Sequence, residues 1–305
     1  MARETDEPTA STGLGTAAVV TAVFFWGMGN VLVKYIRLPG LALAFYRLVV
    51  GAVVYSIVLR VAGGRLTRQM ILAAAPGGIA FGLDMALFFV SLKHTSVADA
   101  SVITALQPAL VFLVAGPLFA ERLSRRMVGW TAVAVVGVVI AIVGSSAGAG
   151  RTLFGDLAAA VSLFAWSYYF VASKQARQKL SALEYQAAMT VVAAFVIAPL
   201  ALAQPSDLSV PDLATVGWIM VMVLVPGGGH LLVNWAHRYS SIALASTLTL
   251  GIPVVGVIGA AVLLSEPLTA VQIFGIGVAL VALTLVLRRP PPARAPSLAE
   301  APELL

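Results

Sequence analysis

The chain has 305 residues, of which 60% are hydrophobic and only 10% are charged, and its mean hydropathy is +0.98. This balance excludes an ordinary soluble domain and indicates an integral membrane protein. The net charge of +6 does not indicate a nucleic-acid partner, because the basic residues stand one to three at a time at the ends of apolar runs. The absence of cysteine excludes disulfides and cysteine-based metal sites.

Apolar runs separated by short polar breaks predict ten membrane-spanning helices, because about twenty apolar residues are needed to cross a bilayer. The expected spans, in chain order, are 14–36, 41–62, 69–92, 97–120, 127–146, 154–176, 182–203, 213–236, 241–264 and 269–287. The polar segment 1–13 and the Pro-rich segment 288–305 are expected to be cytoplasmic tails, the second of them disordered. The first apolar run is too long for a cleavable signal peptide, so we expect it to remain in the mature protein.

Two of these spans repeat one another. Residues 98–121 read ADASVITALQPALVFLVAGPLFAE and residues 243–266 read ALASTLTLGIPVVGVIGAAVLLSE, so a Thr, a Pro and a closing Glu recur at an offset of about 145 residues. The mid-span prolines, Pro108 and Pro253, each remove a backbone donor and free the carbonyl four residues earlier. Those carbonyls belong to Thr104 and Thr249, whose hydroxyls can satisfy loosened backbone in lipid.

The sequence therefore predicts two kinked membrane helices. One interpretation is a bend that only improves packing. The other is a pair of matched interruptions at the interface between repeats, where transporters bind their substrates.

The repeat extends to the first span of each half. Trp26 and Lys34 in WGMGNVLVK correspond to Trp166 and Lys174 in WSYYFVASK, at an offset of about 140 residues. The chain thus divides into residues 14–146 and 154–287 with five spans each, and an odd number of spans inverts the second half relative to the first. If both termini are cytoplasmic, fourteen Lys and Arg residues lie on that side and four on the other, a strong positive-inside bias.

These features resemble a known family. Two five-span halves, each with Trp and Lys in the first span, Pro in the fourth and a Glu that closes the fourth (Glu121-Arg122-Leu123 and Glu266-Pro267-Leu268), are similar to the EamA-type members of the drug/metabolite transporter superfamily. The similarity covers the chain without its termini, and the chain most resembles the bacterial aromatic amino acid exporters of the YddG type. The resemblance implies ten helices as two inverted five-helix repeats, a bacterial inner (plasma) membrane location, alternating access and export of small metabolites.

Polar residues inside the spans are the first candidates for the site. Asp84 is the only carboxylate deep in a span, so it should face the bundle interior, either for cation or proton handling or for a structural hydrogen bond. In PGGGHLLVNW, His230 and Asn234 lie one turn apart on one helix face, after Pro226 and three glycines. His230 could bind substrate or a proton, or make an interhelical bond. Arg47 is expected to snorkel or to pair with a helix end, with a substrate carboxylate as the alternative.

Aromatic and amide side chains supply the remaining candidates. Trp26 and Trp166 are mid-span and related by the repeat, so they could line a pocket for an aromatic solute, with core packing as the alternative. Gln107, beside Pro108, is a candidate for a carboxylate or ammonium group. The expected substrate-binding residues are Trp26, Asn30, Tyr46, Asp84, Phe88, Gln107, Trp166, Tyr169, His230 and Asn234, and the expected kink or gating residues are Thr104, Pro108, Thr249 and Pro253. Glu121 and Glu266 are expected to anchor helix ends, with gating as the alternative.

The leading hypothesis is an exporter that binds an amino acid or related metabolite between the halves. A membrane-embedded transferase would need clustered acids for Mg²⁺ or a nucleophile with its base, and neither is present near a span, so we expect no enzyme activity, no cofactor and no metal. A membrane scaffold would leave the buried polar residues unexplained.

Within transporters, export of other metabolites or cationic drugs remains an alternative. Proton coupling would have to rest on Asp84 or His230, since the first span has no acid, and we favour facilitated movement. The expected partners are a small-molecule substrate and the lipid bilayer, with no nucleic acid, and a monomer is the simplest oligomeric state.

Overall fold

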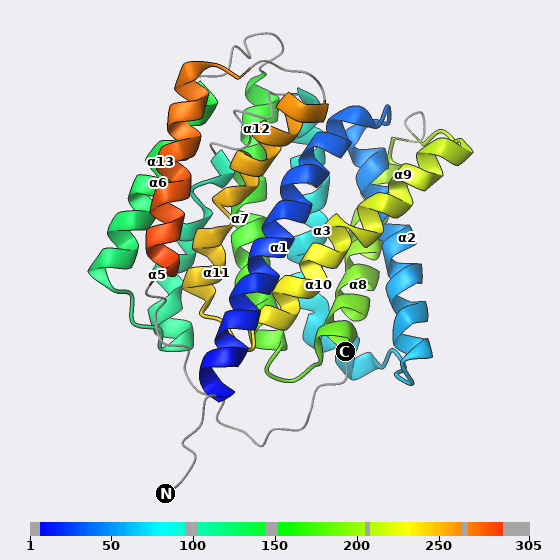
Figure 1. Ribbon diagram of the computed structural model, residues 1–305. Helices are drawn as coiled ribbons and strands as arrows, with labels where there is room; N and C mark the ends of the chain where they lie inside the picture. The colour runs from blue at the N-terminus through cyan, green and yellow to red at the C-terminus, as the bar shows by residue number, and fades with distance from the viewer. Residues whose placement is uncertain are drawn as a thin grey trace, which may run out of the picture.

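The described part of the chain consists of helices without strands (Figure 1). The computed structural model describes residues 7–94, 100, 103–143, 152–204, 208–263 and 268–288. Within these ranges the helices are α1 (Glu7–Tyr35), α2 (Gly40–Val61), α3 (Arg68–His94), α5 (Gln107–Phe119), α6 (Arg125–Val143), α7 (Leu153–Ala176), α8 (Ala182–Leu202), α9 (Leu213–Leu224), α10 (Pro226–Ala236), α11 (Ile242–Leu248), α12 (Gly251–Leu263) and α13 (Ala270–Leu287). Glu266 and the expected tail from residue 289 onward lie outside the described residues.

The length and apolar character of these helices suit a bilayer. Nine of the ten expected spans contain a described helical run that is long and apolar enough to cross a membrane, and the fourth contains the shorter apolar helix α5. Large apolar side chains point outward along the spans: Leu113 is 73% exposed, Phe195 76% and Phe274 64%. A membrane protein must present such side chains to lipid, so the expected all-α membrane fold is confirmed.

The first helix begins earlier than its apolar run. α1 starts at Glu7, whereas its apolar part runs from Gly13 to Tyr35. Residues 7–13, expected to belong to a polar tail, thus continue the first span as helix. Hydropathy marks only the apolar part, because a helix needs no bilayer to form over polar residues.

The expected kinks are breaks. In the ninth span α11 ends at Leu248 and α12 starts at Gly251, so the prediction of one kinked helix around Pro253 was wrong in detail. Pro253 has no N–H for the carbonyl of Thr249, and the N–H of Ile252 donates to that carbonyl instead, at 2.9 Å. The Thr249 hydroxyl lies 2.6 Å from the carbonyl of Ser246, which is how a Thr side chain satisfies freed backbone within a membrane.

The fourth and eighth spans are interrupted in a similar way. α5 starts at Gln107 with Pro108 in its first turn, and α10 starts at Pro226 after α9 ends at Leu224. Proline is favoured at the first positions of a helix because the N–H that it lacks has no partner there. The prolines therefore begin new helix segments in the middle of the bundle.

The two halves pack chiefly against each other. α1, the first span of the first half, packs against α10 and α12 of the third and fourth spans of the second half. α7, the first span of the second half, packs in the same way against α3 and α5. Exchanging the halves therefore reproduces these contacts, as a pseudo-two-fold axis between two inverted repeats requires.

The second and fifth spans complete this pattern. α2 packs against α8, and α6 against α13. Between α6 and α13 the backbones meet: a Cβ added at Gly137 would lie 2.6 Å from the backbone nitrogen of Ala279. Such close approach is typical of helix pairs in membranes, where small residues let backbones touch.

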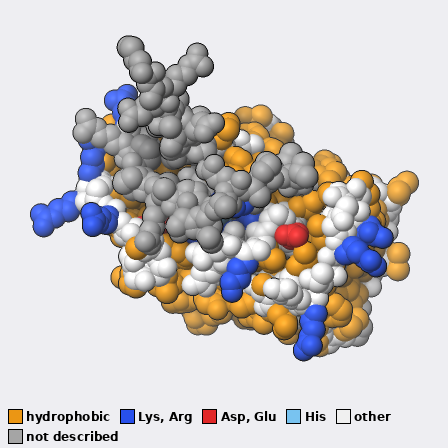
Figure 2. All heavy atoms as spheres, turned by 90° about the horizontal axis from the view of Figure 1, so that it is seen from below, with side chains coloured by type: hydrophobic (Ala, Val, Ile, Leu, Met, Phe, Trp, Pro, Cys, Tyr) orange, Lys and Arg blue, Asp and Glu red, His pale blue; other side chains and the backbone are white. Residues whose placement is uncertain are grey.

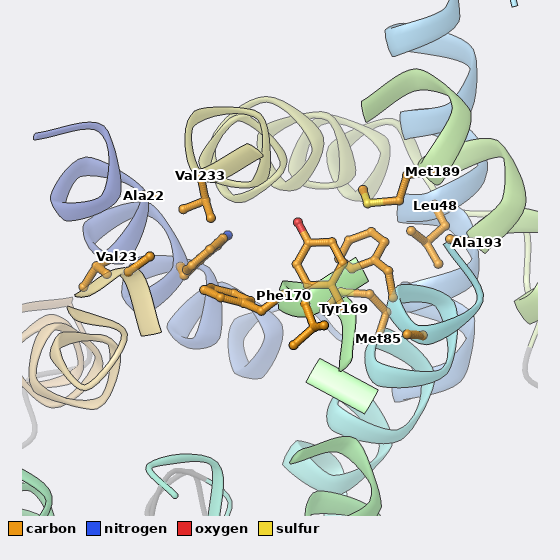
Figure 3. Packing of buried hydrophobic residues seen from close by; sticks show 14 of the residues in the cluster. Ala22, Val23, Leu48, Met85, Tyr169, Phe170, Met189, Ala193 and Val233 are labelled. Carbon is orange, nitrogen blue, oxygen red and sulfur yellow. The ribbon is translucent and has the colours of Figure 1, made fainter. Parts of the chain in front are cut away.

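The buried core lies at the junction of the halves. Tyr169 and Phe170 of α7 are fully buried, and Figure 3 shows them between Ala22 on one side and Met85 and Met189 on the other. Since α1 and α3 belong to the first half and α7 and α8 to the second, the core binds the halves together. It also fixes the orientation of α7, which supplies one wall of the cavity described next.

Candidate functional site

A cavity lies between the halves, at mid-span height. Its volume, measured with a water-sized sphere, is about 80 Å³. One buried water requires roughly 10–15 Å³ on the same measure, so the cavity can hold several waters or a small solute. Its lining residues are Trp26, Gly29, Asn30, Val33, Arg47, Asp84, Met85, Phe88, Phe89, Thr104, Ala105, Trp166, Met222, Pro226, His230, Thr249, Ile252 and Pro253. Both halves and all three interrupted spans contribute to this wall.

Two tryptophans related by the repeat form one side of the cavity. The rings of Trp26 and Trp166 meet edge to face, with centroids 5.1 Å apart. The indole N–H of Trp26 donates to the carbonyl of Pro226 at 3.0 Å, and the ring of His230 lies 4.8 Å from that of Trp26. Edge-to-face geometry is the favoured arrangement of aromatic pairs, so this wall is a rigid aromatic surface.

Glycines allow that wall to form. A Cβ at Gly229 would lie 2.9 Å from Nε1 of Trp26, and one at Gly29 would lie 2.8 Å from the Pro226 ring. Any side chain at either position would push α1 and α10 apart. The glycine run that follows Pro226 therefore seats Trp26 against α10.

Asp84 lies in the cavity wall opposite a hydroxyl of the other half. Its side chain is 3% exposed, and Oδ1 accepts a hydrogen bond of 2.6 Å from Ser162 of α7. No other described residue hydrogen-bonds this carboxyl group. Oδ1 thus accepts a hydrogen bond from the protein, and the remaining acceptor sites of the carboxyl group are available to a ligand in the cavity.

Arg47 also lines the cavity, a position that the snorkelling interpretation did not predict. Its side chain is 5% exposed, and Nη1 donates to Sδ of Met85 at 2.9 Å. The guanidinium carbon lies 5.5 Å from the ring centre of Phe89. The signal in the sequence was the rarity of a basic residue inside a span, but depth alone did not show which way the side chain points.

Behind the cavity, polar side chains form a buried network that positions His230. The hydroxyl of Tyr169 lies 3.3 Å from Nδ1 of His230 and donates to Oδ1 of Asn234 at 3.2 Å. Nδ2 of Asn234 donates to Oε1 of Gln186 at 2.8 Å. Tyr169 and Asn234, both expected to bind substrate, therefore sit one layer behind the lining and hold His230 in place.

The two broken fourth spans meet at another polar contact. Thr249 Oγ1 lies 2.8 Å from Oε1 of Gln107, and Nε2 of Gln107 has no hydrogen-bond partner among the described residues. Thr104 and Thr249 line the cavity, whereas Gln107 and Pro108 do not. Gln107 of α5 and Thr249, which caps α11, thus touch beside the cavity.

Of the ten expected substrate-binding residues, six line the cavity, and Tyr46 lies away from it. Its hydroxyl donates to the carbonyl of Ser209, in the segment before α9, at 2.9 Å. The expected residues that do line the cavity are Trp26, Asn30, Asp84, Phe88, Trp166 and His230.

Known proteins resemble this chain over 42% to 91% of its length. The pseudopaline exporter of Pseudomonas aeruginosa is 28% identical over 130 residues, which cover 42% of this chain and 46% of that protein. The chain therefore matches about half the length of that relative. A "probable amino-acid metabolite efflux pump" of Salmonella typhimurium is 26% identical over 83% of this chain and 88% of its own.

A solved structure shares the fold. A protein of known crystal structure superposes with a TM-score of 0.74 and 19% identity, covering 91% of this chain and 96% of the other. An "uncharacterized transporter" of Archaeoglobus fulgidus is 25% identical over 88% of this chain and 96% of its own. The EamA-like transporter family matches residues 13–143 and 153–288, nearly the whole of both halves. The chain belongs to the EamA-like transporter family.

Proposed function

We propose that the chain exports amino acids or closely related metabolites, aromatic ones among them, by alternating access of the two repeats around the central cavity. The observation that carries this proposal is the composition of the cavity wall, in which Arg47 and Asp84 stand with Trp26 and Trp166. A cavity between inverted repeats, next to broken helices, is where transporters of this architecture bind substrate. The aromatic wall offers a flat apolar surface to the side chain of the solute.

The relatives support the direction of transport. Two of them carry names that denote export, one of pseudopaline and one of amino-acid metabolites. The second name denotes solutes related to amino acids, and the cavity has charges of both signs. The aromatic amino acid branch of the family is a finer assignment that rests on the two tryptophans alone.

The distribution of charge supports an inner-membrane protein with cytoplasmic termini. Figure 2 shows the end at which α1 begins, where Lys and Arg dominate the charged surface outside the grey atoms. The exposed basic residues at or next to the helix ends on this side of the molecule are Arg60, Arg65, Arg68, Arg122, Arg125, Arg126, Lys179, Arg238 and Arg288. Positively charged residues accumulate on the cytoplasmic side of bacterial membrane proteins, which supports a cytoplasmic location for this end.

A proton-coupled exporter of other metabolites or of cations is the second candidate. The observation that favours it is Asp84, a buried carboxyl group within a span that has a single hydrogen-bond partner among the described residues. Intramembrane acids of this kind often mark proton or cation pathways. The facilitative and coupled versions differ in whether a pH gradient drives the flux.

Counterflow in proteoliposomes tests the proposed function. Purified protein is reconstituted, loaded with unlabelled tryptophan, phenylalanine or threonine, and supplied with the radiolabelled amino acid outside, with and without a pH gradient. We expect uptake above empty vesicles that does not depend on the gradient. Uptake that requires the gradient and is lost in Asp84→Asn would establish the coupled alternative, and no uptake of any amino acid would overturn the proposal.

The matched control is Asp212→Asn. Asp212 is exposed and caps α9 by accepting from the N–H of Thr215 at 2.8 Å. Asn is an equally good cap, so this variant removes an acid without disturbing the helix. Its uptake should equal that of the wild type.

A further inference from the structure

Arg47 is a buried cation that forms no ion pair with any described residue. No described carboxylate lies within 4.0 Å of its guanidinium, and its contacts are a thioether sulfur and an aromatic ring. Guanidinium stays charged at any physiological pH. A charge inside the bilayer persists only where it faces protein or water, and Arg47 faces the cavity.

Neither neighbour of Arg47 satisfies its hydrogen-bonding capacity. Thioether sulfur is a weak acceptor, and the Phe89 ring at 5.5 Å offers only its face. A guanidinium group has five N–H donors in a planar fork that matches a carboxylate in two parallel hydrogen bonds. The cavity therefore holds a preformed receptor for a carboxylate.

Asp84 provides the opposite charge in the same cavity. It precedes Met85, the residue that contacts Arg47, and only Oδ1 is engaged, by Ser162. Arg47 and Asp84 are not paired with each other, although both line the cavity. Two opposite charges held apart in one pocket leave each of them available for a ligand group.

We infer that the cavity recognises a zwitterion, with the carboxylate of the solute on Arg47 and its ammonium group on Asp84. This inference rests on the proposed function and assigns the substrate class of that site as α-amino acids with both groups free. The side chain of the solute then lies towards Trp26, Trp166 and Phe88, the aromatic part of the lining.

The charge arrangement disfavours the other cargo classes. A phosphate-bearing solute would meet the carboxylate of Asp84, and an organic cation would meet Arg47, with like charges close together in each case. A neutral apolar solute would leave both charges buried and unpaired, which is costly. Only a solute with both charges compensates the whole wall, and its net charge of zero makes its transport independent of the membrane potential.

Competition by single-group analogues tests the inference on the wild-type protein. Uptake of labelled tryptophan is measured against unlabelled tryptophan, tryptophanamide, which lacks the carboxylate, and indole-3-propionate, which lacks the ammonium group. We expect each analogue to compete about 10-fold to 100-fold more weakly than tryptophan, because each loses one charge-assisted interaction. Competition by tryptophanamide as strong as that by tryptophan would overturn the inference. The proposed exporter function would still hold in that case, because the labelled tryptophan is taken up.

Variants assign each group to its residue. Arg47→Gln should weaken competition by tryptophan while leaving competition by tryptophanamide unchanged. Asp84→Asn should weaken competition by tryptophan while leaving competition by indole-3-propionate unchanged. Arg60→Gln, at the exposed end of the same helix α2, is the control and should match the wild type. If Arg47→Gln does not fold, the analogue series on the wild type decides. Retained discrimination against tryptophanamide in a folded Arg47→Gln variant would overturn the assignment to Arg47.

Discussion

Lys174 of α7 and Glu121, which follows α5, form a salt bridge of 3.0 Å between the two halves. The Lys174 ammonium also donates to the carbonyl of Ser240 at 2.7 Å. The Glu121 carboxylate accepts from the backbone N–H groups of Ile242 and Ala243, at 2.7 and 3.1 Å. One carboxylate therefore joins the end of the first half's fourth span to the start of the second half's fourth span and to α7.

This contact anchors helix ends of the two halves to each other. The side chains of Lys174 and Glu121 are 15% and 9% exposed, so loss of either partner leaves the other charge largely buried without its counter-ion. We expect Glu121→Gln and Lys174→Met each to lower the free energy of unfolding by about 1–3 kcal/mol, and the double variant to lose less than the sum of the two. Thermal unfolding in detergent measures this, with exposed Lys179→Met as the control at the same end of the bundle. Strict additivity would show that the two side chains do not interact.

A pair of adjacent glycines tests how the aromatic wall is seated. In Gly229→Ala the new methyl group meets the indole of Trp26, whereas nothing lies within 4 Å of a Cβ at Gly228. Overpacking should lower the stability of Gly229→Ala by about 1–3 kcal/mol, with a displaced Trp26 and reduced transport. Gly228→Ala should be as stable as the wild type or slightly more stable, because alanine favours a helix. Equal unfolding temperatures for the two variants would contradict this packing.

Trp166 tests the aromatic part of the lining. We expect Trp166→Ala to reduce counterflow of tryptophan and phenylalanine more than that of threonine, because only aromatic solutes lose a stacking partner worth about 0.5–1.5 kcal/mol. Phe164→Ala is the control, since Phe164 lies on the same helix but is 62% exposed on its outer face. An equal loss for all three amino acids in Trp166→Ala would assign Trp166 to packing alone.

His237 predicts a dependence of stability on pH. It caps α10 just beyond the membrane-spanning segment Leu213–Ala236, and burial lowers its pKa well below the ordinary value, with Lys174 and Arg177 lowering it further. The folded protein therefore keeps this imidazole neutral, while the unfolded chain binds a proton below about pH 6.5. Its contribution to stability is full above that pH and is lost as the pH falls.

His237→Phe checks this dependence. Neither ring nitrogen of His237 has a hydrogen-bond partner among the described residues, so replacement by an apolar ring should cost little at pH 7.5. Between pH 7.5 and 5.5 the unfolding temperature of the wild type should fall more steeply than that of the variant. Parallel curves would show that His237 is not a source of acid lability. The same substitution at exposed His94 controls for the loss of an imidazole.

Much of the architecture could be predicted from the sequence, because a bilayer fixes span length and an internal repeat fixes topology. Hydropathy located the spans, and the duplicated prolines Pro108 and Pro253 located the breaks of the fourth and ninth spans. Asp84 and His230 could be found because polar side chains deep in a span must face protein or water. Trp26 and Trp166 could be found because the repeat relates them, and the structure places both in the cavity wall.

The rotation of each helix could not be predicted, because hydropathy gives depth and not direction. Tyr46 and Arg47 are neighbours in one span, yet Arg47 lines the cavity and Tyr46 binds the carbonyl of Ser209. Side-chain contacts between the two halves could not be predicted from the sequence either. Lys174 and Glu121 are far apart in the sequence and come together only when the inverted halves pack.

The measurement that tests the account most directly is protection of a single cysteine in the cavity by a transported solute. The chain contains no cysteine, so Asn30→Cys introduces a unique thiol at a half-buried position in the lining. A saturating amino acid that this variant transports should slow its labelling by N-ethylmaleimide, while Val210→Cys, 94% exposed in the wild type, should be labelled at the same rate with and without the solute. Unchanged labelling of Asn30→Cys in a variant that still transports would contradict passage of the solute through the cavity between the halves.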